Sequence, residues 1–209
     1  MKPGVSKLAK WATGIPSRLL WGGAVAIGML GMVRYQMTPD AQAREGPHTW
    51  PPGVNDMVRG PTRFTLVMTL HPQCPCSRAS LNELSQLMTR SEGQVDAHVL
   101  FVNPPGAPAG WSDGDLWKQA GEIPGVNVSI DHEGKDASFF GATTSGQVMV
   151  YDASGMIRFS GGITDGRGHE GDNAGLSAIL GLIREGHTAV SATPVYGCSL
   201  GVCALSNKE

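Results

Sequence analysis

Residues 64–88 read FTLVMTLHPQCPCSRASLNELSQLM, and this stretch decides the fold. Residues 64–70 form an apolar run with the length of a buried strand. Residues 77–88 carry leucines at helical spacing, which predicts a helix. Cys74 and Cys76 therefore stand where a strand meets a helix N-terminus. The free N–H groups and the partial positive charge at such a terminus stabilise a thiolate, which is the reactive form of cysteine.

The following chain alternates strand and helix patterns. Apolar strands are expected at 97–102, 126–130, 147–151 and 156–160, and helices at 113–122, 137–140 and 174–184. The last two strands are separated by a short turn and form a hairpin. In order, the elements are β-α-β-α-β, a hairpin and a helix. The sequence therefore predicts an α/β fold with a central mixed sheet and flanking helices.

This order of elements is the layout of the thioredoxin fold. The cysteine stretch resembles the TlpA/ResA-type membrane-anchored thioredoxins, whose motif runs C-x-P-C-R-A-E-x-P-x-L. The chain from HPQCPCSRAS to GITDGRGHEGDN also looks like the bacterial proteins labelled RedB. Laid on the motif, Cys74 takes the first cysteine position, Ser77 takes the second, and Cys76 lies between them. The resemblance implies a thioredoxin-like domain with a nucleophile at Cys74.

The C-P-C-S pattern leaves two partners open for Cys74. A disulfide with Cys76 would close a smaller ring than C-x-x-C, so we expect it to be strained and easily reduced. Alternatively, Cys74 is a lone nucleophile and a cysteine of the tail resolves it. Residues 143–146 (TTSG) stand where thioredoxins carry a cis-proline that faces the cysteines, so substrate docking there is expected to differ.

The loop 161–173 is expected beside Cys74, because the hairpin returns the chain to that end of the sheet. His169 in this loop could lower a thiol pKa, relay a proton or ligate a metal. The alternative is a polar loop without a role in catalysis, in which Asp172 or Asn173 caps the last helix. Arg167 and Glu170 either act at the site or form a surface pair, and His71 is a thiolate partner, a metal ligand or a strand-end residue.

The tail after residue 186 contains Cys198 and Cys203. These two cysteines could form a structural disulfide. Alternatively, Cys198 folds back to exchange with Cys74 or to complete a metal site. About ten residues of tail can bridge roughly 30 Å, which makes that return possible.

The N-terminus has the order of an export signal. Leu19–Val33 carries no charge, and four basic residues but no acidic one precede it. An uncleaved anchor and a cleaved signal both remain open, and the positive flank predicts that the domain faces outward. We expect a single-pass membrane protein with its domain on the periplasmic side. The divisions are a cytoplasmic N-terminus (1–18), a transmembrane anchor or signal segment (19–34), a linker (35–62), the thioredoxin-like domain (63–186) and the cysteine-containing tail (187–209).

Three functions compete, and nucleic-acid binding is disfavoured because the body is acidic. The first is a cofactor-free thiol–disulfide oxidoreductase that uses Cys74, with Cys76, Ser77, His169 and Cys198 as further site residues and exported thiol or disulfide proteins as partners. The second resembles the Sco-type copper chaperones, with Cys74, Cys76, His71 and His169 as ligands suited to Cu(I). The third is an interaction domain that kept the fold without catalysis.

Overall fold

The structure is a computed structural model that describes residues 7–40, 45–54, 57 and 64–201. The chain divides into two compact units between Thr38 and Pro39. Within the first unit, residues Lys7–Gln36 form helix α1. No helix in the described ranges has both the length and the apolar character that crossing a membrane requires, so the transmembrane helix predicted at 19–34 is not found. The uncharged run inside α1 has 15 residues, whereas a spanning helix needs about 20.

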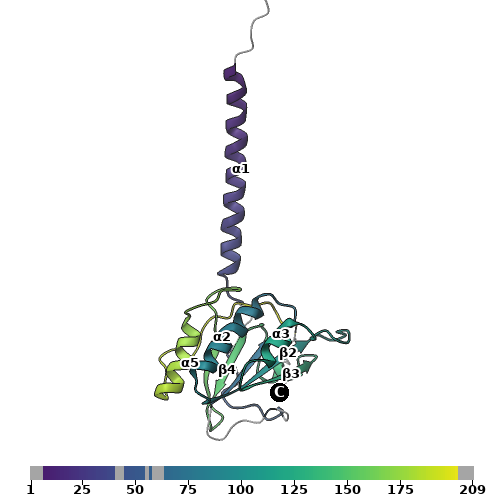
Figure 1. Ribbon diagram of the computed structural model, residues 1–209, viewed down its shortest axis with the longest axis vertical. Coiled ribbons are helices and arrows are strands. Elements are labelled where there is room, and N and C mark those ends of the chain that lie inside the picture. Colours follow the sequence, from purple (N-terminus) through teal and green to yellow (C-terminus); the bar gives the residue numbers. More distant parts are fainter. Residues whose placement is uncertain (1–6, 41–44, 55–56, 58–63, 202–209) are drawn as a thin grey trace, which may run out of the picture. The chain divides into compact units, whose positions relative to one another are not determined.

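The second unit is built on a five-stranded sheet in the order β3-β2-β1-β4-β5 (Figure 1). The strands are β1 (Phe64–Leu70), β2 (Val95–Asn103), β3 (Val126–His132), β4 (Gln147–Tyr151) and β5 (Ile157–Gly162). β1, β2 and β3 run parallel to one another, whereas β4 is antiparallel to both β1 and β5. The sheet is therefore mixed, and its central strand β1 ends directly before the cysteine motif.

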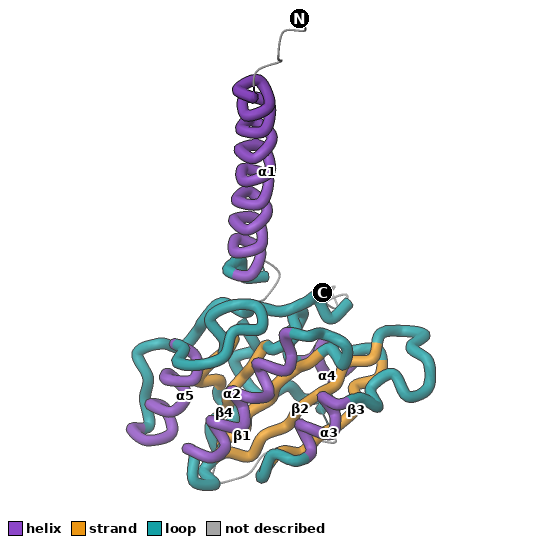
Figure 2. Tube along the Cα trace, turned by 45° about the horizontal axis from the view of Figure 1, so that its top comes forward, coloured by secondary structure: helices purple, strands orange, loops and turns teal. Residues whose placement is uncertain are grey.

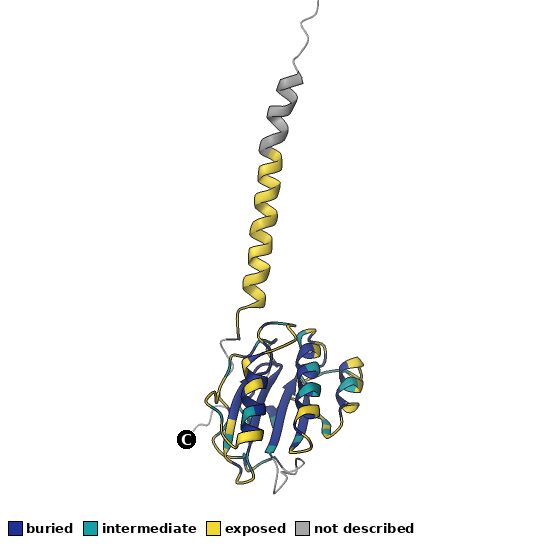
Figure 3. Ribbon diagram, turned by 60° about the vertical axis from the view of Figure 1, so that its left-hand side comes forward, coloured by how far each residue is buried: buried dark blue, intermediate teal, exposed yellow. Residues whose placement is uncertain are grey.

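Helices cover both faces of the sheet (Figure 2). They are α2 (Cys76–Arg90), α3 (Asp115–Gly121), α4 (Lys135–Phe139) and α5 (Ala174–Glu185). α2, α3 and α5 share one hydrophobic core with one face of the sheet, while α4 and the segment around Trp50 pack on the other face. The central strands are consequently buried on both sides, as Figure 3 shows, which is why their sequences are continuous apolar runs rather than alternating ones.

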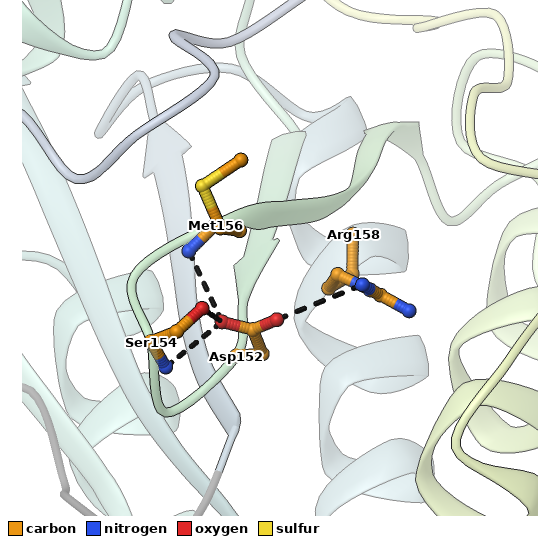
Figure 4. A network of polar contacts seen from close by, with 4 residues as sticks. All are labelled: Asp152, Ser154, Met156 and Arg158. Carbon is orange, nitrogen blue, oxygen red and sulfur yellow. Dashed lines mark hydrogen bonds and ion pairs between the residues drawn. The ribbon is translucent and has the colours of Figure 1, made fainter.

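All nine strands and helices predicted between residues 64 and 186 are present, each with ends within two residues of the expected bounds. The expected hairpin is closed by Asp152 (Figure 4). Its Oδ1 accepts hydrogen bonds from Ser154 N at 2.9 Å, from Ser154 Oγ at 2.5 Å and from Met156 N at 3.1 Å. Arg158 lies 3.7 Å from the second oxygen. This turn sends β5 back toward the cysteine end of the sheet.

Part of the segment expected to be a linker packs on the domain. Trp50 makes edge-to-face contacts with Phe140 at 5.3 Å and with Tyr151 at 5.2 Å between ring centroids. The backbone N–H of Trp50 donates to Gly155 O in the hairpin turn. Residues 45–54 thus close the face of the sheet that carries α4.

Candidate functional site

Cys74 and Cys198 meet at the end of β1. Their Sγ atoms are 3.0 Å apart, although 124 positions separate them in the chain. Cys74 is 2% exposed, while Cys76 and Cys198 are half-buried, and all three are free thiols. The contact places a tail cysteine on the cysteine of the strand–helix junction. Cys203, the other tail cysteine, lies outside the described residues.

The tail reaches Cys74 by pairing its backbone with the segment that precedes β4. Ser145 N donates to Cys198 O at 2.8 Å, and Leu200 N donates to Thr143 O at 2.8 Å. This is an antiparallel bridge between residues 144 and 199. The tail therefore occupies the backbone edge of residues 143–145, which belong to the TTSG stretch beside the cysteines.

Glycines allow this close approach. A Cβ on Gly197 would collide with the carbonyl oxygen of Ser145, and a Cβ on Gly161 or Gly162 would collide with the tail backbone at residues 193–195. Any larger residue at these positions would push the tail away from the sheet. The position of Cys198 thus depends on three glycines at the crossing points.

Two serines and one backbone carbonyl organise the junction. Ser77 Oγ lies 2.9 Å from Ser145 Oγ and 3.2 Å from His71 O. Ser145 Oγ also accepts from His71 N at 2.9 Å, and Cys74 N donates to His71 O at 3.1 Å. Ser77, which takes the second cysteine position of the motif, therefore ties β1, the helix start and the 143–145 segment together.

The three thiols have different pKa values because their surroundings differ. Burial raises the pKa of Cys74, but hydrogen bonds from the thiol and backbone of Cys198, the backbone of Cys76 and the Ser77 hydroxyl outweigh it, so the net pKa is lowered. Burial and the interaction with Cys74 raise the pKa of Cys198 to about 12. Cys76 is also shifted upward, by burial and then by the charge of Cys74. With both thiols protonated, Cys74 Sγ donates to Cys198 Sγ. Cys74 ionises first, and the Cys198 thiol is then the donor to the Cys74 thiolate.

Arg167 brings a positive charge to the thiols. Its guanidinium donates to Gly197 O, the carbonyl directly before Cys198. Its charge lowers the pKa of Cys76 and Cys198 in opposition to their burial. The prediction that the loop 161–173 lies beside the cysteines is confirmed by this contact, but through Arg167 rather than through His169.

The two candidate histidines make other contacts in the described structure. His169 is exposed, and its backbone N–H donates to Gly166 O. The imidazole Nδ1 of His71 accepts from Gln73 N at 3.1 Å, and burial lowers the pKa of His71. His71 thus serves the site with its backbone groups, and its ring is neutral near pH 7.

Glu83, a residue of α2, holds the loop 161–173 through hydrogen bonds. This fully buried carboxylate accepts from Gly171 N at 2.7 Å and from the amide of Asn173 at 3.3 Å. Asn173 in turn caps α5 by accepting from Leu176 N at 2.8 Å, so of the two predicted capping residues Asn173 has this role. Glu170 Oε1 accepts from the Asn82 amide at 2.7 Å.

The predicted copper ligands do not gather. Within the residues that the structure describes, no group of three or more His, Cys, Asp or Glu side chains could hold a metal ion. His71 Nδ1 is engaged with backbone, and His169 is exposed. The copper alternative with Cys74, Cys76, His71 and His169 stays a prediction.

The strand order, the crossover helices and the cysteines at the β1–α2 junction match the predicted layout. The fold is thioredoxin-like. No family model and no curated protein matches the chain.

Solved structures with this fold include an uncharacterized conserved protein from Geobacillus kaustophilus, at a TM-score of 0.57 and 19% identity over 77% of this chain and 91% of the other. A hypothetical protein from Sinorhizobium meliloti 1021 matches at a TM-score of 0.57 and 15% identity, over 81% and 98%. A thioredoxin-like protein solved in its oxidized form matches at 0.46 and 14% identity, over 73% and 97%. At 19% and 15% identity, the likeness of the first two shows the fold alone. The RedB resemblance stays a prediction.

The sequence pointed to residues 143–146 and to the loop 161–173, but it assigned no role to Ser145, Gly161, Gly162 or Gly197. Their roles arise only where distant segments cross. Arg167 had been noted, but as either a site residue or half of a surface pair. A signal for it existed in the sequence, since it is the sole arginine of the loop 161–173 that topology brings to the cysteines.

Proposed function

We propose that this protein is a thiol–disulfide oxidoreductase in which Cys74 is the nucleophile and Cys198 is the resolving thiol. The observation that carries the proposal is the 3.0 Å contact between the two sulfurs. A thiolate attacks a disulfide sulfur and forms a mixed disulfide, which a second thiol nearby then resolves. Cys74 has the lowered pKa that the attacking thiol needs, and Cys198 is already positioned to attack it in return.

Cys76 is less suited to the resolving role. It lies one residue beyond Pro75, at the start of α2, so a bond with Cys74 would close the small ring of C-x-C. A disulfide with Cys198 would give Cys74 a partner without closing so small a ring. Cys76 remains close enough to interact with both other thiols: its charge contributes to the raised pKa of Cys198, and the charge of Cys74 raises the pKa of Cys76.

The proposed place of action is outside the cytoplasm, where disulfides persist. The support is the basic N-terminus followed by an uncharged stretch, the order of an export signal. Substrates would be exported thiols and disulfides, and no bound cofactor is needed for the exchange.

A trapping experiment on the full chain tests the assignment. The reduced protein is mixed with glutathione disulfide, quenched by alkylation and mapped by mass spectrometry. We expect a Cys74–Cys198 disulfide in the wild type and in Cys76→Ser, a trapped mixed disulfide at Cys74 in Cys198→Ser, and neither in Cys74→Ser. A mixed disulfide that is trapped in Cys76→Ser but resolved in Cys198→Ser would overturn the assignment of Cys198.

A further inference from the structure

An open hollow lies against Cys74 on the side of α2 and α3. It has a volume of about 360 Å³ and is lined by Pro72, Gln73, Cys74, Pro75, Arg78, Asp115 and Leu116. Neither Cys76 nor Cys198 belongs to this lining. A molecule in the hollow therefore lies against Cys74, which is 2% exposed, at a wall that the resolving thiol does not line.

The opposite flank of Cys74 is already occupied. There the backbone of residues 143 and 145 is hydrogen-bonded to residues 198 and 200 of the tail. An extended polypeptide that binds by strand addition needs free backbone groups on such an edge. Because the chain's own tail uses these groups, the site favours a substrate that binds through side-chain contacts in the hollow.

The walls of the hollow carry opposite charges. Arg78 extends from α2, with a guanidinium nitrogen 3.4 Å from Gln119 on α3, and Asp115 is the first residue of α3. Both side chains are exposed. Pro72, Pro75 and Leu116 supply apolar surface between them. This combination fits a small-molecule disulfide that carries carboxylate and ammonium groups on either side of its apolar, sulfur-containing centre.

We propose that the hollow beside Cys74 binds a small disulfide with zwitterionic arms, with Arg78 contacting a carboxylate and Asp115 contacting an ammonium group. The proposal rests on the proposed function and narrows its substrate class. Glutathione disulfide has the required groups and serves as the probe. In this arrangement a sulfur of glutathione disulfide approaches Cys74 from the side of α2 and α3, away from the tail.

The exchange balances in two steps. The Cys74 thiolate attacks one substrate sulfur, the substrate S–S bond breaks, and the first glutathione leaves as a thiolate that takes a proton from solvent. Cys198 then loses its proton to solvent and attacks Cys74 Sγ, which breaks the mixed disulfide and releases the second glutathione. The two protein thiols are oxidised to one disulfide, and one glutathione disulfide is reduced to two thiols.

The test compares two probes on the reduced full chain. Glutathione disulfide carries charged arms, whereas bis(2-hydroxyethyl) disulfide carries none. The rate of oxidation is measured by quenching and alkylation for the wild type, Arg78→Gln, Asp115→Asn and the control Arg90→Gln, which removes an exposed arginine at the far end of α2. Each hollow variant should slow oxidation by glutathione disulfide about fivefold and leave the uncharged probe unaffected. The control should leave both rates unchanged.

Equal effects on both probes, or no effect on either, would overturn the proposal. So would faster oxidation by a disulfide-linked unfolded polypeptide than by glutathione disulfide, because the hollow would then serve a protein partner. Failure of the proposed function is separately visible, since neither probe would then oxidise Cys74 in the wild type.

Discussion

The hydrogen bond between Cys198 and Cys74 should determine how reactive Cys74 is at neutral pH. Replacing Cys198 with Ala removes the donor that contributes first to lowering the pKa of Cys74, while the tail backbone keeps its bonds to residues 143 and 145. A hydrogen bond to a charged group stabilises it by about 1.5 kcal/mol or more. Since 1.36 kcal/mol is a factor of ten, the thiolate population of Cys74 below its pKa should fall about tenfold.

The assay is the alkylation rate of Cys74 with iodoacetamide as a function of pH, read by mass spectrometry of the peptide that contains it. Cys198→Ala should be about tenfold slower than the wild type near neutral pH and should approach it at high pH, where the thiol is ionised in both. The matched control is Cys76→Ala. Its effect should be small, because Cys76 helps to lower the pKa of Cys74 through its backbone, which the substitution keeps.

The reasoning would be refuted if the two alanine variants had the same pH profile. It would also be refuted if Cys198→Ala made Cys74 more reactive at neutral pH, because the tail would then act on Cys74 mainly by burying it. Circular dichroism on both variants verifies that the fold is retained, so that a change in rate is a change at the thiol.

Three further outcomes are expected. Glu83→Ala should lower the free energy of unfolding by about 2–4 kcal/mol in urea titrations, because the buried amide of Asn173 and the backbone N–H of Gly171 lose their carboxylate acceptor. Glu83→Gln should cost less, and a loss below about 1 kcal/mol would contradict this role. Burial raises the pKa of Asp152, but hydrogen bonds, above all that from the Ser154 hydroxyl, outweigh it, so the net pKa is lowered. The stabilisation that ionised Asp152 gives the fold is therefore present above the ordinary Asp pKa and is lost as pH falls through the folded-state pKa. Wild type and Asp152→Asn should therefore differ in urea stability near neutral pH, and the difference should shrink as the pH falls below the ordinary Asp pKa. The Cys74–Cys198 disulfide closes a loop of 124 positions, which should stabilise the oxidised form by about 5 kcal/mol and raise its melting temperature by roughly 10–20 °C over the reduced form; equal melting temperatures would contradict the pairing.

The sequence predicted the fold well because its signals are local. The apolar run of β1 and the leucine spacing of α2 lie within short windows, and tertiary packing reinforces both preferences. The hairpin was equally readable, since Asp152 and the residues after it form a turn by their own side-chain chemistry. The expected membrane-spanning helix was the exception, because its uncharged run has marginal length.

Only part of the site could be predicted, because only part of it is encoded by local sequence signals. Cys74 and Ser77 belong to one motif, and their placement follows from the strand–helix junction. The choice of Arg167 over His169 depends on which side chain of a glycine-rich loop turns inward, and residues 161–173 carry no periodicity that decides it. The approach of Cys198 depends on close backbone crossings at glycines, which no spacing rule encodes.

The two possible partners of Cys74 differ most in how each bond would couple to folding. A C-x-C bond with Cys76 ties residues that are neighbours in the unfolded chain as well, so it restricts that ensemble very little. A bond with Cys198 joins positions that only the folded tail brings together, so folding favours the bond and the bond favours folding by the same free energy. The crossing of Gly197 against Ser145, the bond from Arg167 to Gly197 and the bridge at residue 199 all stabilise the tail before any bond forms. In this chain the C-terminal segment therefore provides the preorganised second thiol that the helix position occupied by Ser77 does not.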